Sequence, residues 1–192
     1  MNDYQKKRFS EKVVEKMFNT VTGKKIALLG YAFKKDTGDV RETPAMFVMR
    51  DLIEEQAKLF VYDPQVKRED MWIELNYTCG INIENTPTLE SAVTTINDPY
   101  EACDGAHAVC VLTEWDEFKE YDYQKIYDSM AKPAFIFDGR NVLDHKKLRE
   151  IGFEVHAIGH PDPEQFKNHK KEETQYIVVN KRDLSAFIAV ES

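Results

Sequence analysis

The chain has 192 residues, of which 42% are hydrophobic and 11% aromatic, enough to bury one substantial core. Its 26 basic and 34 acidic side chains leave a formal net charge of −8, which argues against a general nucleic-acid-binding protein because such proteins need clustered excess cations. The sequence contains no apolar run near the roughly 18 residues of a membrane-spanning helix, and its polar start contains no signal-peptide core. We therefore expect a soluble, cytoplasmic, single-domain protein with extensions and with no nucleic-acid or membrane partner.

The three cysteines predict neither a disulfide framework nor a zinc site, because their number is odd and no two share the C-x-x-C spacing. We interpret Cys79, Cys103 and Cys110 as reduced structural thiols. His160 and His169 have no acidic or cysteine neighbours at metal-ligand spacing, so we expect no bound metal.

The first predicted element is an amphipathic helix over residues 5–20, in which Phe9, Val13 and Met17 recur at helical spacing. Charged residues lie between these apolar positions. We expect the apolar stripe of this helix to be partly exposed, which would favour self-association.

A buried strand is predicted over residues 25–30, and the loop that follows it is basic and contains glycine. Gly30 can adopt backbone angles that other residues avoid, and Thr43 followed by Pro44 is a typical start of a helix, here over residues 44–56. The two lysines and one arginine of the loop would add positive charge to the helix N-terminus, which itself attracts anions. Because ligands of open α/β sheets bind at this edge, the loop indicates a phosphate site.

The remainder of the chain alternates between strands and helices. Residues 66–95 indicate a short helix around 69–75 in an otherwise irregular stretch. Further helices are predicted over residues 98–103, 114–121, 123–130 and 144–151, and strands over residues 58–62, 106–112, 134–138 and 153–158. This alternation predicts an α/β fold with a parallel sheet covered by helices on both faces.

Four motifs, in residues 25–45, 98–109, 112–118 and 132–140, occur in the same order in one enzyme family. Together they make the chain resemble the C-terminal, UDP-binding third of the UDP-glucose 6-dehydrogenases, from about Phe9 to Gly159. The resemblance implies a Rossmann-like, three-layer α/β/α fold with a mainly parallel sheet. It implies a lead-in helix over residues 1–22, a UDP-binding domain over 23–159 and a variable C-terminal tail over 160–192.

In that family the complete enzyme oxidises UDP-glucose to UDP-glucuronate with two NAD, in two hydride transfers through a cysteine thioester. The resemblance implies that NAD is bound mainly by an absent N-terminal domain and that the catalytic cysteine belongs to an absent central domain. In this chain no predicted strand is followed by G-x-G-x-x-G, and no cysteine stands in the nucleophile setting of the family. We therefore expect this chain to be inactive alone, and to be monomeric or dimeric although the complete enzyme is a homo-oligomer.

The resemblance places substrate contacts at Phe33 and Lys34 in the first loop. There the lysine would interact with the bound UDP-sugar, and the aromatic ring would help to form its site. Lys35 is a weaker candidate for the same role. The alternative for each lysine is an ordinary solvated side chain.

The resemblance also assigns a substrate contact to Arg140, which follows the strand over residues 134–138. A guanidinium can give two parallel hydrogen bonds to an anionic oxygen, and Gly139 permits close approach of the backbone. A surface salt bridge with Asp138 or Asp144 is the alternative.

The family counterpart of Arg41 reaches NAD across a cleft between domains. Asp36 and Asp39 are expected to stiffen the loop by pairing with cations or capping turns. Asp63, at a strand end, has the position of the ribose-binding acid of dinucleotide folds, but the glycine fingerprint for that role is missing. Trp115 is expected in the core.

Two other functions stay open from the sequence. The chain could be a non-catalytic module that binds a nucleotide sugar or supports assembly. It could also be the same domain of a related dehydrogenase that acts on a GDP-sugar or an N-acetylated sugar.

Overall fold

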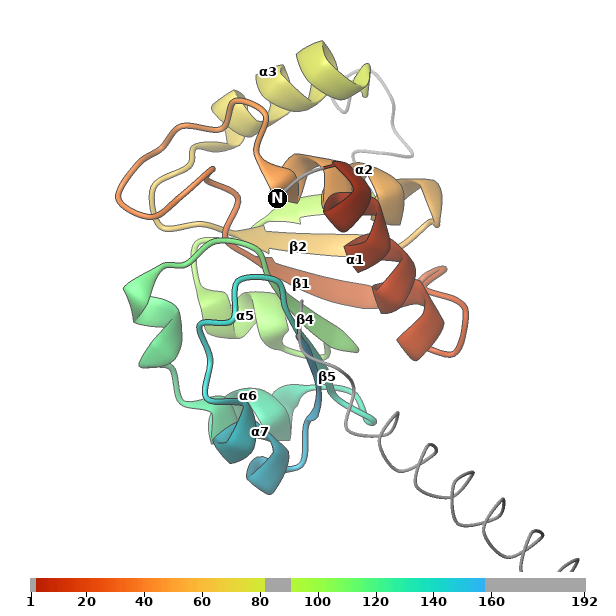
Figure 1. The fold of residues 1–192 in the computed structure, drawn as a ribbon, viewed down its shortest axis with the longest axis vertical. Coiled ribbons are helices and arrows are strands. Elements are labelled where there is room, and N and C mark those ends of the chain that lie inside the picture. Colours follow the sequence, from red (N-terminus) through yellow and green to blue (C-terminus); the bar gives the residue numbers. More distant parts are fainter. Residues whose placement is uncertain (1–2, 82–90, 158–192) are drawn as a thin grey trace, which may run out of the picture. The chain divides into compact units, whose positions relative to one another are not determined.

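Six parallel strands form one sheet in the computed structural model, which describes residues 3–81 and 91–157 (Figure 1). The strands are β1 (Lys25–Leu29), β2 (Lys58–Tyr62), β3 (Val93–Thr95), β4 (Ala108–Val111), β5 (Phe135–Asp138) and β6 (Glu154–Ala157). Every neighbouring pair is parallel, which confirms the predicted parallel sheet. Residues 1–158 form one compact unit, and the tail predicted over 160–192 lies outside the described residues.

The strands lie in the order β3-β2-β1-β4-β5-β6, so the direction of strand addition reverses between β1 and β4. These two strands are adjacent, with Ile26 of β1 opposite Ala108 of β4. In open α/β sheets a crevice forms outside the carboxyl ends of the strands at such a reversal. The loops after β1 and β4 therefore mark the edge where a ligand is expected.

Helices cover both faces of the sheet, as predicted (Figure 1). One hydrophobic core contains residues of α1 (Asp3–Lys16), α2 (Pro44–Glu54) and α3 (Arg68–Cys79), and the other contains residues of α5 (Pro99–Cys103), α6 (Tyr123–Ser129) and α7 (His145–Ile151). Successive residues of β1 alternate between the two, because strand side chains point to opposite faces. None of the helices in the described part of the chain has the length and apolar character needed to span a membrane.

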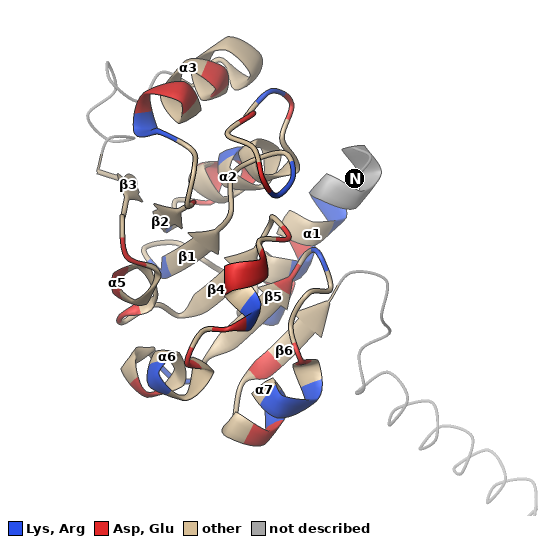
Figure 2. Ribbon diagram, turned by 90° about the vertical axis from the view of Figure 1, so that its left-hand side faces the viewer, with Lys and Arg blue, Asp and Glu red and all other residues tan. Residues whose placement is uncertain are grey.

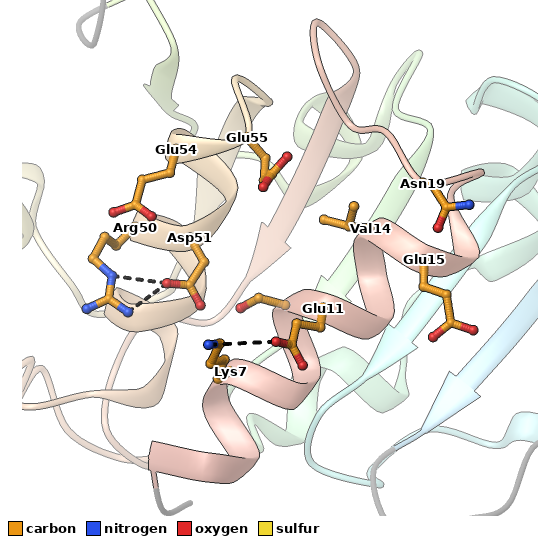
Figure 3. A pocket seen from close by; sticks show the side chains of 10 residues that line it. Lys7, Glu11, Val14, Glu15, Asn19, Arg50, Asp51, Glu54 and Glu55 are labelled. Carbon is orange, nitrogen blue, oxygen red and sulfur yellow. Dashed lines mark hydrogen bonds and ion pairs between the residues drawn. The ribbon is translucent and has the colours of Figure 1, made fainter.

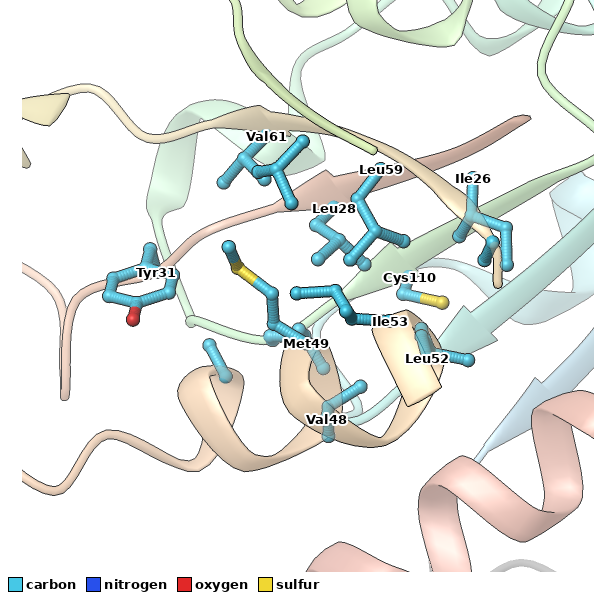
Figure 4. Packing of buried hydrophobic residues seen from close by; sticks show 14 of the residues in the cluster. Ile26, Leu28, Tyr31, Val48, Met49, Leu52, Ile53, Leu59, Val61 and Cys110 are labelled. Atoms are coloured by element: carbon cyan, nitrogen blue, oxygen red, sulfur yellow. The ribbon is translucent and has the colours of Figure 1, made fainter. Parts of the chain in front are cut away.

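Helix α2 is positioned by its first turn and by its apolar face. The Thr43 side chain accepts the backbone N–H of Ala45, and Pro44 occupies a first-turn position where a missing N–H is tolerated. Met49 and Leu52 of α2 are fully buried among residues of the sheet such as Leu28 (Figure 4). Burial of such a side chain contributes about 1.5–3 kcal/mol to the free energy of folding, so this packing fixes α2 at the end of the first loop.

The apolar stripe of α1 is buried, which corrects the expectation that it is partly exposed. Phe9, Val13 and Met17 are each at most 4% exposed, and the Phe9 ring meets Phe137 of β5 edge to face. Phe18 is exposed; it lies just after the helix and has a positive φ. The structure thus gives α1 an intramolecular partner, and the argument for self-association is lost.

The prediction of an α-helix over residues 114–121 is wrong. That segment forms only a short 3₁₀ helix, η1 (Asp116–Lys119). Trp115 and Phe118 belong to the second core and the partly buried Tyr121 packs against it. A spacing of three residues suits the three-residue turn of a 3₁₀ helix better than an α-helix. Tertiary packing therefore decided the local conformation.

Two further boundaries differ from prediction. Strand β3 lies in the stretch that was predicted irregular, where it pairs with β2, and α3 runs on to Cys79. The strand predicted over residues 106–112 begins only at Ala108, so His107 precedes β4 rather than lying inside it.

Candidate functional site

The carboxylate of Asp63 ties together the ends of β1, β2 and β4. Asp63 Oδ2 accepts the backbone N–H groups of Tyr31 at 2.7 Å and Ala32 at 3.0 Å, and the indole Nε1–H of Trp115 at 3.1 Å. Its Oδ1 accepts two N–H groups of its own loop at 2.9 and 3.0 Å. Because five donors already occupy this carboxylate, the structure gives Asp63 a bracing role in place of ribose binding. Trp115 is 5% exposed, which confirms its predicted place in the core.

Gly30 lets β1 pass close to the segment after β4. It has a φ of +91°, and a Cβ added to it would lie 2.5 Å from Thr113 Cβ and 2.8 Å from the Thr113 backbone nitrogen. The buried Thr113 hydroxyl donates to the carbonyl of Ala32 at 2.7 Å. The predicted need for glycine at this position is confirmed, and its reason is the approach of Thr113.

Phe33 and Lys34 lie on the loop that leaves this brace. The Phe33 N–H donates to the Asp39 carbonyl at 2.8 Å, which closes the loop at its base. The Phe33 ring is 48% exposed. Lys34 is also exposed and forms no direct ion pair with a described residue, although its charge helps to lower the pKa of Asp39. Both predicted substrate residues are therefore accessible to a ligand.

Lys35 takes part in a surface charge network with the segment after β4. Its Nζ lies 2.7 Å from Asp116 Oδ2, and Lys119 Nζ lies 2.6 Å from Asp116 Oδ1. The two lysines lower the pKa of Asp116 to about 2. Asp116 in turn raises the pKa of Lys35. Lys35 thus connects the first loop to η1.

Arg140 is paired with Glu114. The guanidinium Nε donates to Glu114 Oε2, and Nη2 contacts the same oxygen, with the side chains 23% and 29% exposed. The predicted alternative, a salt bridge of Arg140 with Asp138 or Asp144, is wrong because the ion-pair partner is Glu114. The fully buried Asp138 instead accepts the backbone N–H of Arg140 at 3.0 Å and thereby shapes the loop after β5.

Asp138 also anchors the remainder of that loop. Its Oδ2 accepts the N–H of Leu143 at 3.0 Å and lies 2.9 Å from His145 Nε2. Gly139 donates its N–H to the Val111 carbonyl at 2.9 Å, so the loop after β5 crosses the end of β4. Arg140 is therefore held beside the segment that carries Glu114.

Arg41 is bound to its own loop. Its Nε and Nη2 donate to the two carboxylate oxygens of Asp39 at 2.9 and 2.7 Å, and its side chain is 80% exposed. The Arg41 guanidinium lowers the pKa of Asp39 to about 2. The expected pairing of Asp39 with a cation is confirmed.

Acidic and basic residues are interspersed along these loops (Figure 2). Lys35, Arg41 and Arg140 each have a carboxylate partner, whereas Lys34 has none among the described residues. A ligand anion therefore meets one lysine without a direct ion pair and three cations that are already paired with a carboxylate. A group of three or more residues able to hold a metal ion is absent from the part of the chain that the structure describes.

A separate hollow of about 500 Å³ lies between α1 and α2 (Figure 3). Carboxylates predominate in its lining, which includes Glu11, Glu15 and Glu54. An acidic lining disfavours phosphate, and no residue predicted to bind substrate contributes to it.

Sequence reasoning missed Glu114 as the ion-pair partner of Arg140, and it named Asp138 only as a salt-bridge alternative. Glu114 follows β4 by three residues, and that position near a strand end was the available signal. The pairing itself joins residues 26 apart in sequence and depends on the neighbouring ends of β4 and β5.

The fold and the site define this chain as a Rossmann-like α/β domain whose cation-bearing loops meet at the strand-order reversal. A family profile described as UDP-glucose/GDP-mannose dehydrogenase family, UDP binding domain, matches residues 27–145. The chain belongs to the UDP-glucose/GDP-mannose dehydrogenase family.

Similarity to individual proteins supports the same family assignment. The chain is 56% identical over 167 residues to UDP-glucose 6-dehydrogenase 4 of Oryza sativa subsp. japonica, covering 84% of this chain and 35% of that protein. It is 52% identical over 161 residues to UDP-glucose 6-dehydrogenase of Gallus gallus, covering 83% and 32%. A solved structure of a UDP-glucose dehydrogenase from Pyrobaculum islandicum matches with a TM-score of 0.57 and 28% identity, covering 81% of this chain and 29% of that one. The chain thus spans about a third of the length of these relatives.

Proposed function

We propose that this chain is the UDP-sugar-binding domain of an NAD-dependent UDP-glucose 6-dehydrogenase, which converts UDP-glucose to UDP-glucuronate. The observation that carries the proposal is the position of Lys34, an exposed cation without an ion-pair partner among the described residues, at the strand-order reversal. The identity of 56% to a relative of that name supports the choice of substrate. The free thiols support a reducing, cytoplasmic location.

Three residues would divide the recognition of UDP-glucose. Lys34 would place a point charge on the diphosphate, and Arg140 would exchange its contact with Glu114 for hydrogen bonds to the diphosphate. The half-exposed ring of Phe33 provides a flat apolar surface for the ligand. Binding energy from the UDP part would thereby position the sugar for chemistry elsewhere in the complete protein.

The first loop of this chain does not fit the pyrophosphate of a dinucleotide. In a dinucleotide-binding fold the N–H groups after the first strand face the phosphates, but here those of Tyr31 and Ala32 are bound to Asp63. We therefore propose that NAD is bound mainly by a part of the complete protein outside this chain. Arg41, 80% exposed, would reach that NAD with the N–H groups that Asp39 leaves free.

We further propose that the chain alone does not oxidise UDP-glucose. Burial raises the pKa of all three thiols, those of Cys79, Cys103 and Cys110, which disfavours a nucleophilic thiolate at each of them. From the family resemblance we also propose that the complete protein forms a homo-oligomer.

Titration of the full 192-residue chain tests the binding proposal. Calorimetry with UDP-glucose, UDP, GDP-mannose and NAD is expected to give selective binding of the uridine ligands. Lys34→Ala and Arg140→Ala should each weaken that binding by roughly 10- to 100-fold, because a hydrogen bond to a charged group contributes about 1.5–3 kcal/mol. Lys58→Ala is the matched control, since Lys58 is exposed at the opposite end of β2.

Equal binding of uridine and guanosine ligands would contradict the proposed specificity. Unchanged affinity in both site variants would remove Lys34 and Arg140 from the site. Loss of affinity in Lys58→Ala of the same size would show that net charge alone controls binding.

A further inference from the structure

The charge of Glu114 acts on two cations at this edge of the sheet, Arg140 and Lys35. Its Oε2 receives the Arg140 guanidinium, while its charge also acts on Lys35, whose pKa it helps to raise. Lys35 itself is bound to Asp116, not to Glu114. Of the two cations that the proposed function assigns to substrate, Arg140 is therefore the one in direct contact with the Glu114 carboxylate.

The Glu114–Arg140 pair is half-buried, so water screens it less than an exposed ion pair. Two N–H groups of the guanidinium already point at one carboxylate oxygen. An anion that binds Arg140 through this edge has to displace that carboxylate, and the displaced charge stays close to the anion. Bare anions are thereby disfavoured.

A ligand that carries hydroxyl groups changes this balance. An ionised carboxylate only accepts hydrogen bonds, so a displaced Glu114 needs new donors. Ribose or sugar hydroxyls supply such donors in the same molecule as the diphosphate, whereas inorganic diphosphate at neutral pH supplies few or none. New hydrogen bonds from these hydroxyl groups to Glu114 offset the loss of its contact with Arg140. Only a hydroxyl-bearing diphosphate can supply them.

We propose that Glu114 is a specificity-determining residue that selects hydroxyl-bearing nucleoside diphosphates over bare diphosphate. This inference rests on the proposed function, since it assumes that Arg140 meets the diphosphate. It adds a role for Glu114, the counter-ion of Arg140, in deciding which diphosphates bind.

The test compares UDP with inorganic diphosphate on the full chain and on Glu114→Gln. The glutamine keeps the side-chain shape, removes the charge and can donate to a phosphate oxygen. Affinity for inorganic diphosphate is expected to rise about tenfold, because a nearby like charge is removed. Affinity for UDP should change less, so the preference for UDP over inorganic diphosphate should fall.

Glu120→Gln is the matched control, because Glu120 is exposed beyond η1 and its replacement makes the same change in net charge. Its preference for UDP should equal that of the unmodified chain. Glu114→Ala is a second variant in case Glu114→Gln does not fold, and thermal unfolding followed by circular dichroism checks both.

Equal weakening of both ligands in the Glu114 variants would show that Glu114 only braces Arg140, and an unchanged preference would show that it has no part in selection. Either result overturns the inference while leaving UDP binding by Lys34 and Arg140 intact. Absence of UDP binding in the unmodified chain would instead overturn the proposed function.

Discussion

The indole Nε1 of Trp115 donates a hydrogen bond to Asp63 Oδ2 at 3.1 Å, which joins the loop after β4 to the loop after β2. The same oxygen accepts the N–H groups that begin the loop after β1. Three loops at the carboxyl edge of the sheet therefore share one acceptor. The positions of Lys34 and Glu114 depend on a residue that we expect to make no contact with the ligand.

Removal of this acceptor should destabilise the fold. We expect Asp63→Ala to lower the free energy of unfolding by about 2–4 kcal/mol, because several partly buried N–H groups lose their partner. Urea unfolding measures the change. Asp104→Ala, at an exposed position, should stay within about 0.5 kcal/mol of the unmodified chain, and a similar small effect of Asp63→Ala would contradict the bracing role.

Gly30→Ala should be more destabilising than an alanine at another left-handed glycine. Gly23 has a φ of +71°, and no atom lies within 4 Å of the place that an added Cβ would take, so Gly23→Ala should cost only about 1–2 kcal/mol of backbone strain. Gly30→Ala adds a clash with the backbone of Thr113 and is expected to exceed that cost clearly. Equal losses in urea unfolding would mean that Thr113 moves away without penalty.

The Asp39–Arg41 pair predicts an acid titration well below the ordinary range. The guanidinium lowers the pKa of Asp39 from 3.8 to about 2, so its contribution to folding is present above about pH 4 and is lost as the pH falls toward 2. In Arg41→Ala the NMR titration of the Asp39 carboxyl should move back toward 3.8. Asp116, whose pKa is held at about 2 by Lys119 and Lys35, should not shift and is the internal control. A low Asp39 midpoint that persists without Arg41 would contradict this assignment.

The cysteines should differ in reactivity. Burial raises the pKa of Cys103 to about 12 and also raises the pKa values of Cys110 and Cys79, but the Cys79 side chain is only half-buried and therefore more accessible. Alkylation at about pH 8 followed by mass spectrometry should modify Cys79 first in the folded chain and all three residues after unfolding. Early modification of Cys103 or Cys110, with Cys79→Ser as the comparison, would show that the second core opens readily.

Much of the fold could be predicted from local patterns. The apolar runs at β1 and β5 and the Thr43–Pro44 helix start identify their elements because burial and capping act within a few residues. Strand β3 could not be found this way, since three residues form a strand only by pairing with β2. The 3₁₀ helix after Trp115 likewise follows from packing against the second core.

The sequence by itself determined the class of fold, the family and the residues that stand at the strand ends, because each depends on residue types in a fixed order along the chain. Only the tertiary structure decided which cations are neutralised. Lys35 and Asp116 are 81 residues apart, and Arg140 and Glu114 are 26 apart. Ion pairing depends on distance in space, and neighbouring parallel strands bring these residues together while leaving Lys34 without a partner among the described residues.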